Sequence, residues 1–457
     1  MEAKFMEEKQ PVNLSEMKLG ASNMKIMLSA SLGQFLGQGL ATLIGIIIPL
    51  LQLTEHPPLS SGVIGILGCI SLIGIMVGSP IIGHLSDKYG YLLPFRLCPA
   101  ICGLSALSVI IFPTVEVLVP ALFIMGCMVG GEYSLDPNYI TALMPARWKV
   151  FMVGLAKALA SAGSVFVAII CYVIISQKFT ANIWSSLMWI VVGLCGVMFI
   201  TRLWFAENPV WLMEHGKKMQ AQQAVCKMLG PNVEHDSMSL EPQAKGATIS
   251  LGKFILLQFR RVVLTGIPWA CEGLGVYGIG IFLPILVMAF GLDSDLHFSS
   301  AIGRISHSVL MTFILCVVMM IGFGVGLALL KKINHISMQI AGFVISAAGL
   351  ALVLAAYLLH WHSWVAIAGF MMFELALNAG PHLITFILPS QVFSAADRGT
   401  GAGVAASVGK SGAVVGAFCI PVILHHWGAV GVLSISIIVM LLGALITRLF
   451  LPTGADQ

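Results

Sequence analysis

The sequence predicts an all-α polytopic membrane protein with twelve transmembrane helices in two halves of six. Three observations support this prediction. Of the 457 residues, 58% are apolar and only 10% are charged, whereas soluble chains carry about 25% charged residues. The apolar residues form twelve runs, and a helix needs about 20 such residues to cross a bilayer. One long hydrophilic stretch separates the sixth run from the seventh.

The twelve predicted spans share a high apolar content and are separated by polar or turn-forming residues. They cover residues 24–53, 62–84, 95–114, 118–144, 151–176, 183–205, 255–290, 298–330, 336–358, 363–388, 399–424 and 428–450. With the N-terminus inside, 20 of the 24 Lys and Arg residues fall in inner loops or at inner helix ends, and only Lys178 lies in an outer loop. The positive-inside rule therefore predicts that both termini are cytoplasmic.

The chain divides into two membrane halves joined by a polar segment. The predicted parts are a cytoplasmic tail 1–23, a first half 24–205, a central loop 206–254, a second half 255–450 and a tail 451–457. Residues 207–229 of the central loop can form an amphipathic surface helix, and an unstructured linker is the alternative. Its apolar positions are Trp211, Leu212, Val225, Met228 and Leu229.

Charged residues inside the spans are the main candidates for function, because such groups are costly in lipid unless they are paired or used. Glu132 and Asp136 are four residues apart and share one helix face. At 1.5 Å per residue, Asp136 and Lys157 lie at about 12 Å and about 10 Å from the same membrane face. We therefore predict an Asp136–Lys157 ion pair. The alternative is that Lys157 extends its amine to the inner surface.

Four charged residues lie nearer the middle of the membrane. Glu132, Glu272, Glu374 and Lys410 are each about 16–18 Å from one end of their spans. Asn378 and His382 follow Glu374 at helical spacing and extend its polar face. These residues are candidates for binding substrate or protons, and structural pairing between helices is the alternative.

Several motifs lie at the ends of the predicted spans. The loop after the second span reads Gly83-His-Leu-Ser-Asp87-Lys88-Tyr-Gly90. Three further motifs are Pro137-x-Tyr139 with Pro145, Glu207-Asn-Pro209-Val-Trp211-Leu212, and Arg398-Gly-Thr-Gly401-x-Gly403 followed by Gly409-Lys410. The first resembles the G-x-L-x-D-R/K-x-G loop of the major facilitator superfamily, and the others resemble motifs of its sugar-porter and metabolite–proton symporter branches. The resemblance covers essentially the whole chain.

The resemblance implies a fold, a gate and a central cavity. The fold would be the major facilitator fold, with spans one, four, seven and ten lining the cavity, so that Gln38 joins the substrate- and proton-binding candidates. The cytoplasmic gating loops would use Gly83, Asp87, Lys88, Gly90, Arg147 and Arg398. The chain departs from the family at Ala142 and Gln391, where relatives carry Glu, and at Leu122, where many proton-coupled members carry Arg.

The function predicted from these features is secondary active transport by alternating access. The substrate would be a small polar metabolite (an organic acid, a zwitterion or a sugar), moved by proton-coupled uptake across a bacterial inner membrane. We expect a monomer in the lipid bilayer. We also expect no catalytic residues, metal, cofactor or nucleic-acid partner. Efflux of drugs or metabolites and a transport-like membrane sensor are the alternatives.

Overall fold

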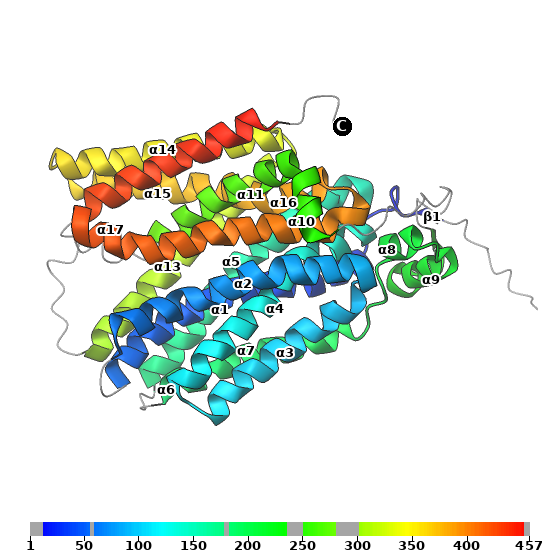
Figure 1. Ribbon diagram of the computed structural model, residues 1–457, viewed down its shortest axis with the longest axis horizontal. Coiled ribbons are helices and arrows are strands. Elements are labelled where there is room, and N and C mark those ends of the chain that lie inside the picture. The colour runs from blue at the N-terminus through cyan, green and yellow to red at the C-terminus, as the bar shows by residue number, and fades with distance from the viewer. Residues whose placement is uncertain (1–11, 55–58, 178–181, 235–249, 280–300, 452–457) are drawn as a thin grey trace, which may run out of the picture.

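The computed structural model describes residues 12–54, 59–177, 182–234, 250–279 and 301–451. Helices form nearly all of this part, which confirms the predicted fold class. They make two elongated bundles that lie side by side (Figure 1). The N-terminal bundle comprises α1 to α7 and the C-terminal bundle comprises α10 to α17. Contacts of α2 with α17 and of α5 with α13 join the two bundles.

Long apolar helices build the N-terminal bundle. They are α1 (Ala21–Thr54), α2 (Ser61–Tyr89), α3 (Leu92–Ile111), α4 (Val115–Leu143) and α5 (Lys149–Gln177), followed by the consecutive pair α6 (Ile183–Ser186) and α7 (Met188–Arg202). A 3₁₀ turn, η1 (Ala146–Trp148), precedes α5. The Ser60 side chain caps the start of α2, and Gly90, at φ 107°, ends it.

The C-terminal bundle contains more broken helices. Its elements are α10 (Leu251–Leu257), α11 (Phe259–Leu274), the π-helical turn η3 (Gly275–Ile279), α13 (Ala301–Leu329), α14 (His335–Leu358), α15 (Ser363–Ala379), α16 (Pro381–Val392), the 3₁₀ turn η4 (Ala395–Asp397) and α17 (Arg398–Leu449). Gly428, at φ 61°, interrupts α17 and divides it into two crossings. Gly380 and Pro381 separate α15 from α16 within the tenth span.

The predicted twelve spans agree with these helices. Within the described ranges, ten helices are long and apolar enough to cross a membrane, and α10 with α11, bent by 94°, can form one more. Helix α13 stands at the eighth position, with its described apolar part at Cys316–Leu329. The end of the predicted seventh span, the start of the eighth and Lys178 lie outside the described residues.

The segment between the bundles forms two helices instead of the one predicted over 207–229. They are α8 (Pro209–Glu214) and α9 (Lys218–Leu229), and Gly216, at φ 72°, separates them. Glycine tolerates this left-handed conformation, so the chain can turn there. Trp211, Leu212, Val225 and Met228 are buried as predicted, and Leu229 is partly buried. The strands β1 (Val12–Asn13) and β2 (Val233–Glu234) pair in parallel beside them.

Small residues allow α2 and α4 to pack with their backbones almost in contact. A Cβ atom at Gly78 would collide with the backbone of Cys127, and one at Gly74 would collide with Phe123 and Gly126. Gly65, on the same helix, has nothing within 4 Å of its Cβ position. This close approach is typical of helix packing in membranes, where small residues line the interface.

We predict that Gly78→Ala lowers the melting temperature in detergent, because the new methyl group forces the α2 and α4 backbones apart. Overpacking of this kind costs about 1–3 kcal/mol. The matched control is Gly65→Ala in the same helix, where the methyl group enters open space and alanine favours the helix by up to about 1 kcal/mol. Equal melting temperatures for the two variants would contradict the packing.

Candidate functional site

A buried ion pair occupies the interior of the N-terminal bundle. The guanidinium of Arg202, at the end of α7, donates to both oxygens of Glu132 on α4, at 2.7 and 2.8 Å. Asp136 Oδ1 lies 3.5 Å from Arg202 Nη2, and Gln34 Nε2 on α1 donates to Asp136 Oδ2 at 3.3 Å. Arg202 also lies over the ring of Phe95, 3.7 Å from its centroid. We call Gln34, Glu132, Asp136 and Arg202 the Arg202 cluster.

The predicted Asp136–Lys157 pair is wrong. Asp136 contacts Arg202 and Gln34, whereas the amine of Lys157 lies 5.6 Å from the ring centroids of Tyr133 and Phe386. The predicted depths placed both residues near one level of the membrane, but depth does not fix the direction in which a side chain points. Glu132 and Asp136 share a face of α4 that is directed at α1 and α7. Tyr133, one residue after Glu132, points toward the other bundle.

A second group of polar residues lies where the two bundles meet. We call it the central set, and it contains Gln38, Lys157, Glu272, Tyr277, Glu374, Asn378, His382 and Lys410. Lys410 Nζ on α17 donates to the Tyr277 hydroxyl at 3.0 Å, and that hydroxyl donates to Gln38 Oε1 on α1 at 2.9 Å. This chain of hydrogen bonds crosses from the C-terminal bundle to the N-terminal bundle.

Four residues of the central set form a connected row in the C-terminal bundle. Asn378 Nδ2 donates to Glu374 Oε2 at 3.0 Å, and Asn378 Oδ1 lies 2.9 Å from His382 Nδ1. His382 Nε2 lies 3.5 Å from Glu272 Oε1 on α11. The row therefore links two carboxyl groups through an amide and an imidazole. The break between α15 and α16 falls between Asn378 and His382.

Aromatic rings surround the amines of the central set. Tyr133 packs against Trp269 at 5.7 Å and against Phe386 at 6.0 Å between centroids. The amines of Lys157 and Lys410 lie 5.6 and 5.2 Å from the Tyr133 centroid. Rings at this distance attract cations through their negative faces, so Tyr133 faces both lysines.

The structure brings together six of the seven predicted substrate or proton candidates. Gln38, Glu272, Glu374, Asn378, His382 and Lys410 all belong to the central set. Glu132 is separate from them, because Arg202 binds both of its oxygens. The sequence interpretation missed Arg202, Tyr133, Trp269, Tyr277 and Phe386. The signal for Arg202 was that Lys157 offered a base to Asp136 but left Glu132, on the same helix face, without one.

One end of the bundles is closed by contacts of Asp87, and we call it the Asp87 end. Asp87 accepts hydrogen bonds from the Thr400 N–H at 2.6 Å, the Thr400 hydroxyl at 2.8 Å and the Gly399 N–H at 3.2 Å. Tyr91 donates to the same carboxylate. A Cβ at Gly83 would collide with the Gly399 carbonyl, so this glycine permits the contact between the bundles.

The motif around Glu207 and Trp211 braces this end. Glu207 Oε1 accepts from the N–H groups of Tyr91 at 2.7 Å and Leu92 at 3.1 Å, which are otherwise unpaired at the start of α3. Trp211 Nε1 donates to the Asp87 carbonyl at 2.8 Å. A Cβ at Gly90 would lie 2.6 Å from Glu207 Oε2. Helix α8 is thus fixed against the end of α2 that carries Asp87.

The other predicted gate residues have different contacts. Lys88 lies over the ring of Tyr89 and Arg147 over that of Trp148, each its neighbour in sequence, so neither contact joins the two bundles. Arg398 interacts electrostatically with Asp87 and Glu214. Burial raises the pKa of Glu214 on α8 to about 7, and the nearby Asp87 carboxylate adds to this effect while Arg398 opposes it.

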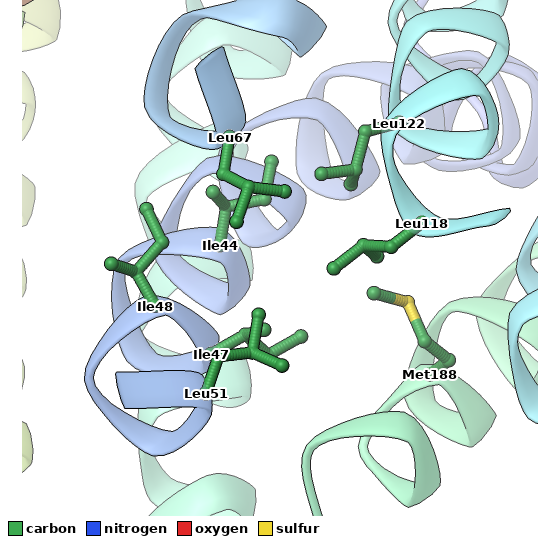
Figure 2. A pocket seen from close by; sticks show the side chains of 8 residues that line it. All are labelled: Ile44, Ile47, Ile48, Leu51, Leu67, Leu118, Leu122 and Met188. Carbon is green, nitrogen blue, oxygen red and sulfur yellow. The ribbon is translucent and has the colours of Figure 1, made fainter. Parts of the chain in front are cut away.

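The departures from the family pattern are accommodated locally. Gln391 pairs with His335 at 3.2 Å, and Ala142 is buried among apolar residues. Leu122 lines an apolar crevice between α1, α2, α4 and α7 (Figure 2). Its neighbours there include Ile44, Leu118 and Met188. An arginine at position 122 would find no acidic partner among these lining residues.

The fold and the central set define a class of protein: a membrane carrier with a polar site between two helical bundles. A family model described as "Sugar (and other) transporter" matches residues 6–456. The chain therefore belongs to this family of the major facilitator superfamily and transports small metabolites. The family and the fold are those of transporters, not of enzymes.

Individual relatives are distant but match over most of their length. The "Inner membrane metabolite transport protein YgcS" of Escherichia coli K12 is 24% identical over 444 residues, covering 97% of this chain and 94% of the relative. The "Low affinity inorganic phosphate transporter 4" of Lotus japonicus is 23% identical over 388 residues, covering 76% and 72%. The solved proton:xylose symporter XylE superposes with a TM-score of 0.80 at 19% identity, covering 94% and 96%.

We predict that Arg202→Met strongly destabilises the protein, because it leaves two carboxylates buried without their cation. Breaking a buried pair from one side costs about 3–5 kcal/mol. Adding Glu132→Gln to this variant should restore part of the melting temperature. Lys157→Met serves as the contrast, since it removes a buried cation that has no acidic partner in the Arg202 cluster. A melting temperature of Arg202→Met equal to that of the wild type would contradict the assignment.

We predict that Glu214 makes stability fall as pH rises. Its pKa of about 7 in the folded protein lies above its ordinary value of 4.5, so the folded state retains the proton that the unfolded state has released. The loss of stability occurs between these two values and is complete above pH 7. Thermal unfolding at pH 5, 6, 7 and 8 should show a smaller decrease for Glu214→Gln than for the wild type. The exposed Glu116→Gln is the control, and an unchanged profile for Glu214→Gln would refute the prediction.

Proposed function

We propose that the protein is a secondary active transporter that takes up a small polar metabolite together with protons by alternating access. The central set carries this proposal, since charged and polar side chains from both bundles meet there. The hydrogen bonds from Lys410 to Tyr277 and from Tyr277 to Gln38 join the bundles at this level. A ligand that replaced or extended these bonds would alter the contact between the bundles.

The Asp87 end supplies the closed gate that alternating access needs. The contacts of Asp87 with Gly399 and Thr400 join α2 to α17, and they must break before the central set can open toward this end. We assign the Asp87 end to the cytoplasm because of the distribution of Lys and Arg, and we place both termini there. The two halves 24–205 and 255–450 would move about the central set as the units of a monomer in a bacterial inner membrane.

Proton coupling is assigned to the row from Glu374 to Glu272. A carboxyl group inside a membrane gains or releases a proton when its surroundings change. Such groups recur in proton-driven carriers. Glu272 faces His382, Lys157 and Lys410, so its charge state depends on what occupies the space beside the lysines. Glu132 is a weaker candidate than its sequence position suggested, because Arg202 already neutralises it.

Transport into proteoliposomes tests the proposal. Purified protein is first screened by thermal shift against sugars, sugar acids and inorganic phosphate, classes that include the substrates named for XylE and for the phosphate transporter. The stabilising compound is then followed into vesicles with and without an inward proton gradient. Accumulation that requires the gradient supports coupled uptake. Gradient-driven export would favour efflux, and binding without transport would favour a sensor.

We predict that Glu272→Gln and Glu374→Gln abolish accumulation driven by the proton gradient but leave substrate exchange at zero gradient. A neutral amide can still accept hydrogen bonds but carries no proton across. The exposed Glu116→Gln, at the start of α4, is the matched control and should accumulate normally. Full accumulation by both Glu272→Gln and Glu374→Gln would refute the coupling role of this row.

A further inference from the structure

Lys157 is a buried amine that no described carboxylate binds directly, although Glu272 acts on it electrostatically. Its side chain is 1% exposed. Among the residues whose side chains are described, it has no hydrogen bond and no ion pair, and its amine lies 5.6 Å from the ring centroids of Tyr133 and Phe386. Removing an ammonium group from water costs several kcal/mol unless a partner compensates. An unpaired ammonium group is therefore expected where a charged ligand completes the site.

Lys410 is also only partly satisfied. Its amine donates to the hydroxyl of Tyr277 at 3.0 Å and also interacts with the Tyr133 side chain, whereas an ammonium group has three donors. It lies 5.2 Å from the same Tyr133 ring that Lys157 faces at 5.6 Å. The two amines are close enough to repel each other electrostatically, and we call the region between them, beside Tyr133, the space between the lysines. Lys157 reaches it from α5 of the N-terminal bundle and Lys410 reaches it from α17 of the C-terminal bundle.

Positive charge exceeds negative charge around this space. Both lysines interact electrostatically with Glu272, whose Oε1 accepts no hydrogen bond and lies 3.5 Å from His382 Nε2. Glu374 is at the far end of the row and accepts from Asn378. Glu132 and Asp136 are bound to Arg202. Among the side chains that the structure describes, two amines thus face a single carboxyl group.

We infer that Lys157 and Lys410 together bind an oxyanion, a carboxylate or phosphate group of the transported metabolite. This inference rests on the proposed function, because it names the substrate class of the same site. Charge-assisted hydrogen bonds from two amines would satisfy donors that the protein leaves free. Tyr133, Trp269 and Phe386 form the adjoining apolar wall for the rest of the ligand.

The positions of the two lysines also give the anion a mechanical role. Each bundle contributes one cation, and two like charges facing one space repel each other. An anion between them replaces this repulsion with attraction from both sides. Binding would therefore favour the arrangement in which the bundles are close together, and a neutral sugar would not provide this effect.

Thermal shift of the purified full-length protein tests the inference with matched pairs of probes. The pairs are gluconate with glucose and glycerol 3-phosphate with glycerol, and inorganic phosphate is added as the simplest oxyanion. We expect at least one anion to raise the melting temperature at tenfold or more lower concentration than its neutral partner. A response to gluconate alone identifies a carboxylate, and a response to the phosphates alone identifies a phosphate group. Equal effects within both pairs, or no effect of any anion, would overturn the inference.

Variants separate ligand binding from folding. Lys157→Gln should unfold at or above the wild-type temperature without ligand, because it removes an unpaired buried charge, and should need at least tenfold more anion for the same shift. Lys157→Arg, which keeps the charge, should retain part of the response, and Lys410→Gln should lose it. Lys331→Gln is the matched control, since that exposed lysine also lies over two rings, Trp148 and Phe151. An unchanged anion response in Lys157→Gln would contradict the inference.

Counterflow in proteoliposomes distinguishes this inference from the proposed function. Exchange of an anion by the wild type, with at least a tenfold loss in Lys157→Gln, supports both. Exchange of glucose or glycerol with no exchange of their anionic partners would retain the transporter and overturn the oxyanion site. Stabilisation by an anion that is lost in Lys157→Gln, with no exchange of any probe, would support the site and overturn transport.

Discussion

The ion pair between Arg202 and Glu132 is the interaction on which the arrangement of the charged residues depends. The pair is fully buried, and Arg202 Nη1 and Nη2 donate one hydrogen bond to each carboxylate oxygen of Glu132. Gly33 on α1 makes room for the two carboxylates, because a Cβ there would lie 2.6 Å from oxygens of both Glu132 and Asp136. The pair joins α4 to α7, the hydrogen bond from Gln34 to Asp136 adds α1, and these acids are left no role between the bundles.

Arg202 holds Glu132 and Asp136 within the N-terminal bundle, so neither acid is available to Lys157. Lys157 is left without a carboxylate of its own bundle, and it faces the space that Lys410 and Glu272 border from the other side. The charge that attracts a ligand is therefore supplied by both bundles. At the Asp87 end, the contacts to Gly399 and Thr400 join the two bundles.

The sequence was sufficient to predict the membrane helices that the structure describes, because hydropathy and span length depend on local composition. It also identified polar residues that the structure brings together where the bundles meet, such as Glu272, His382 and Lys410. It failed on the partner of Asp136, since depth along a helix does not specify the direction around it. The break between α8 and α9 at Gly216 was missed because the apolar pattern continues on both sides. Contacts such as Tyr277 with Gln38 join residues far apart in sequence, and no local pattern encodes them.

An experimental structure with the transported metabolite bound tests the division of charges most directly. The account predicts an oxyanion of the ligand within hydrogen-bond distance of the amines of both Lys157 and Lys410, with Arg202 still paired to Glu132. A ligand that contacts Glu132 and displaces Arg202, or one that binds with no contact to Lys157, would contradict it.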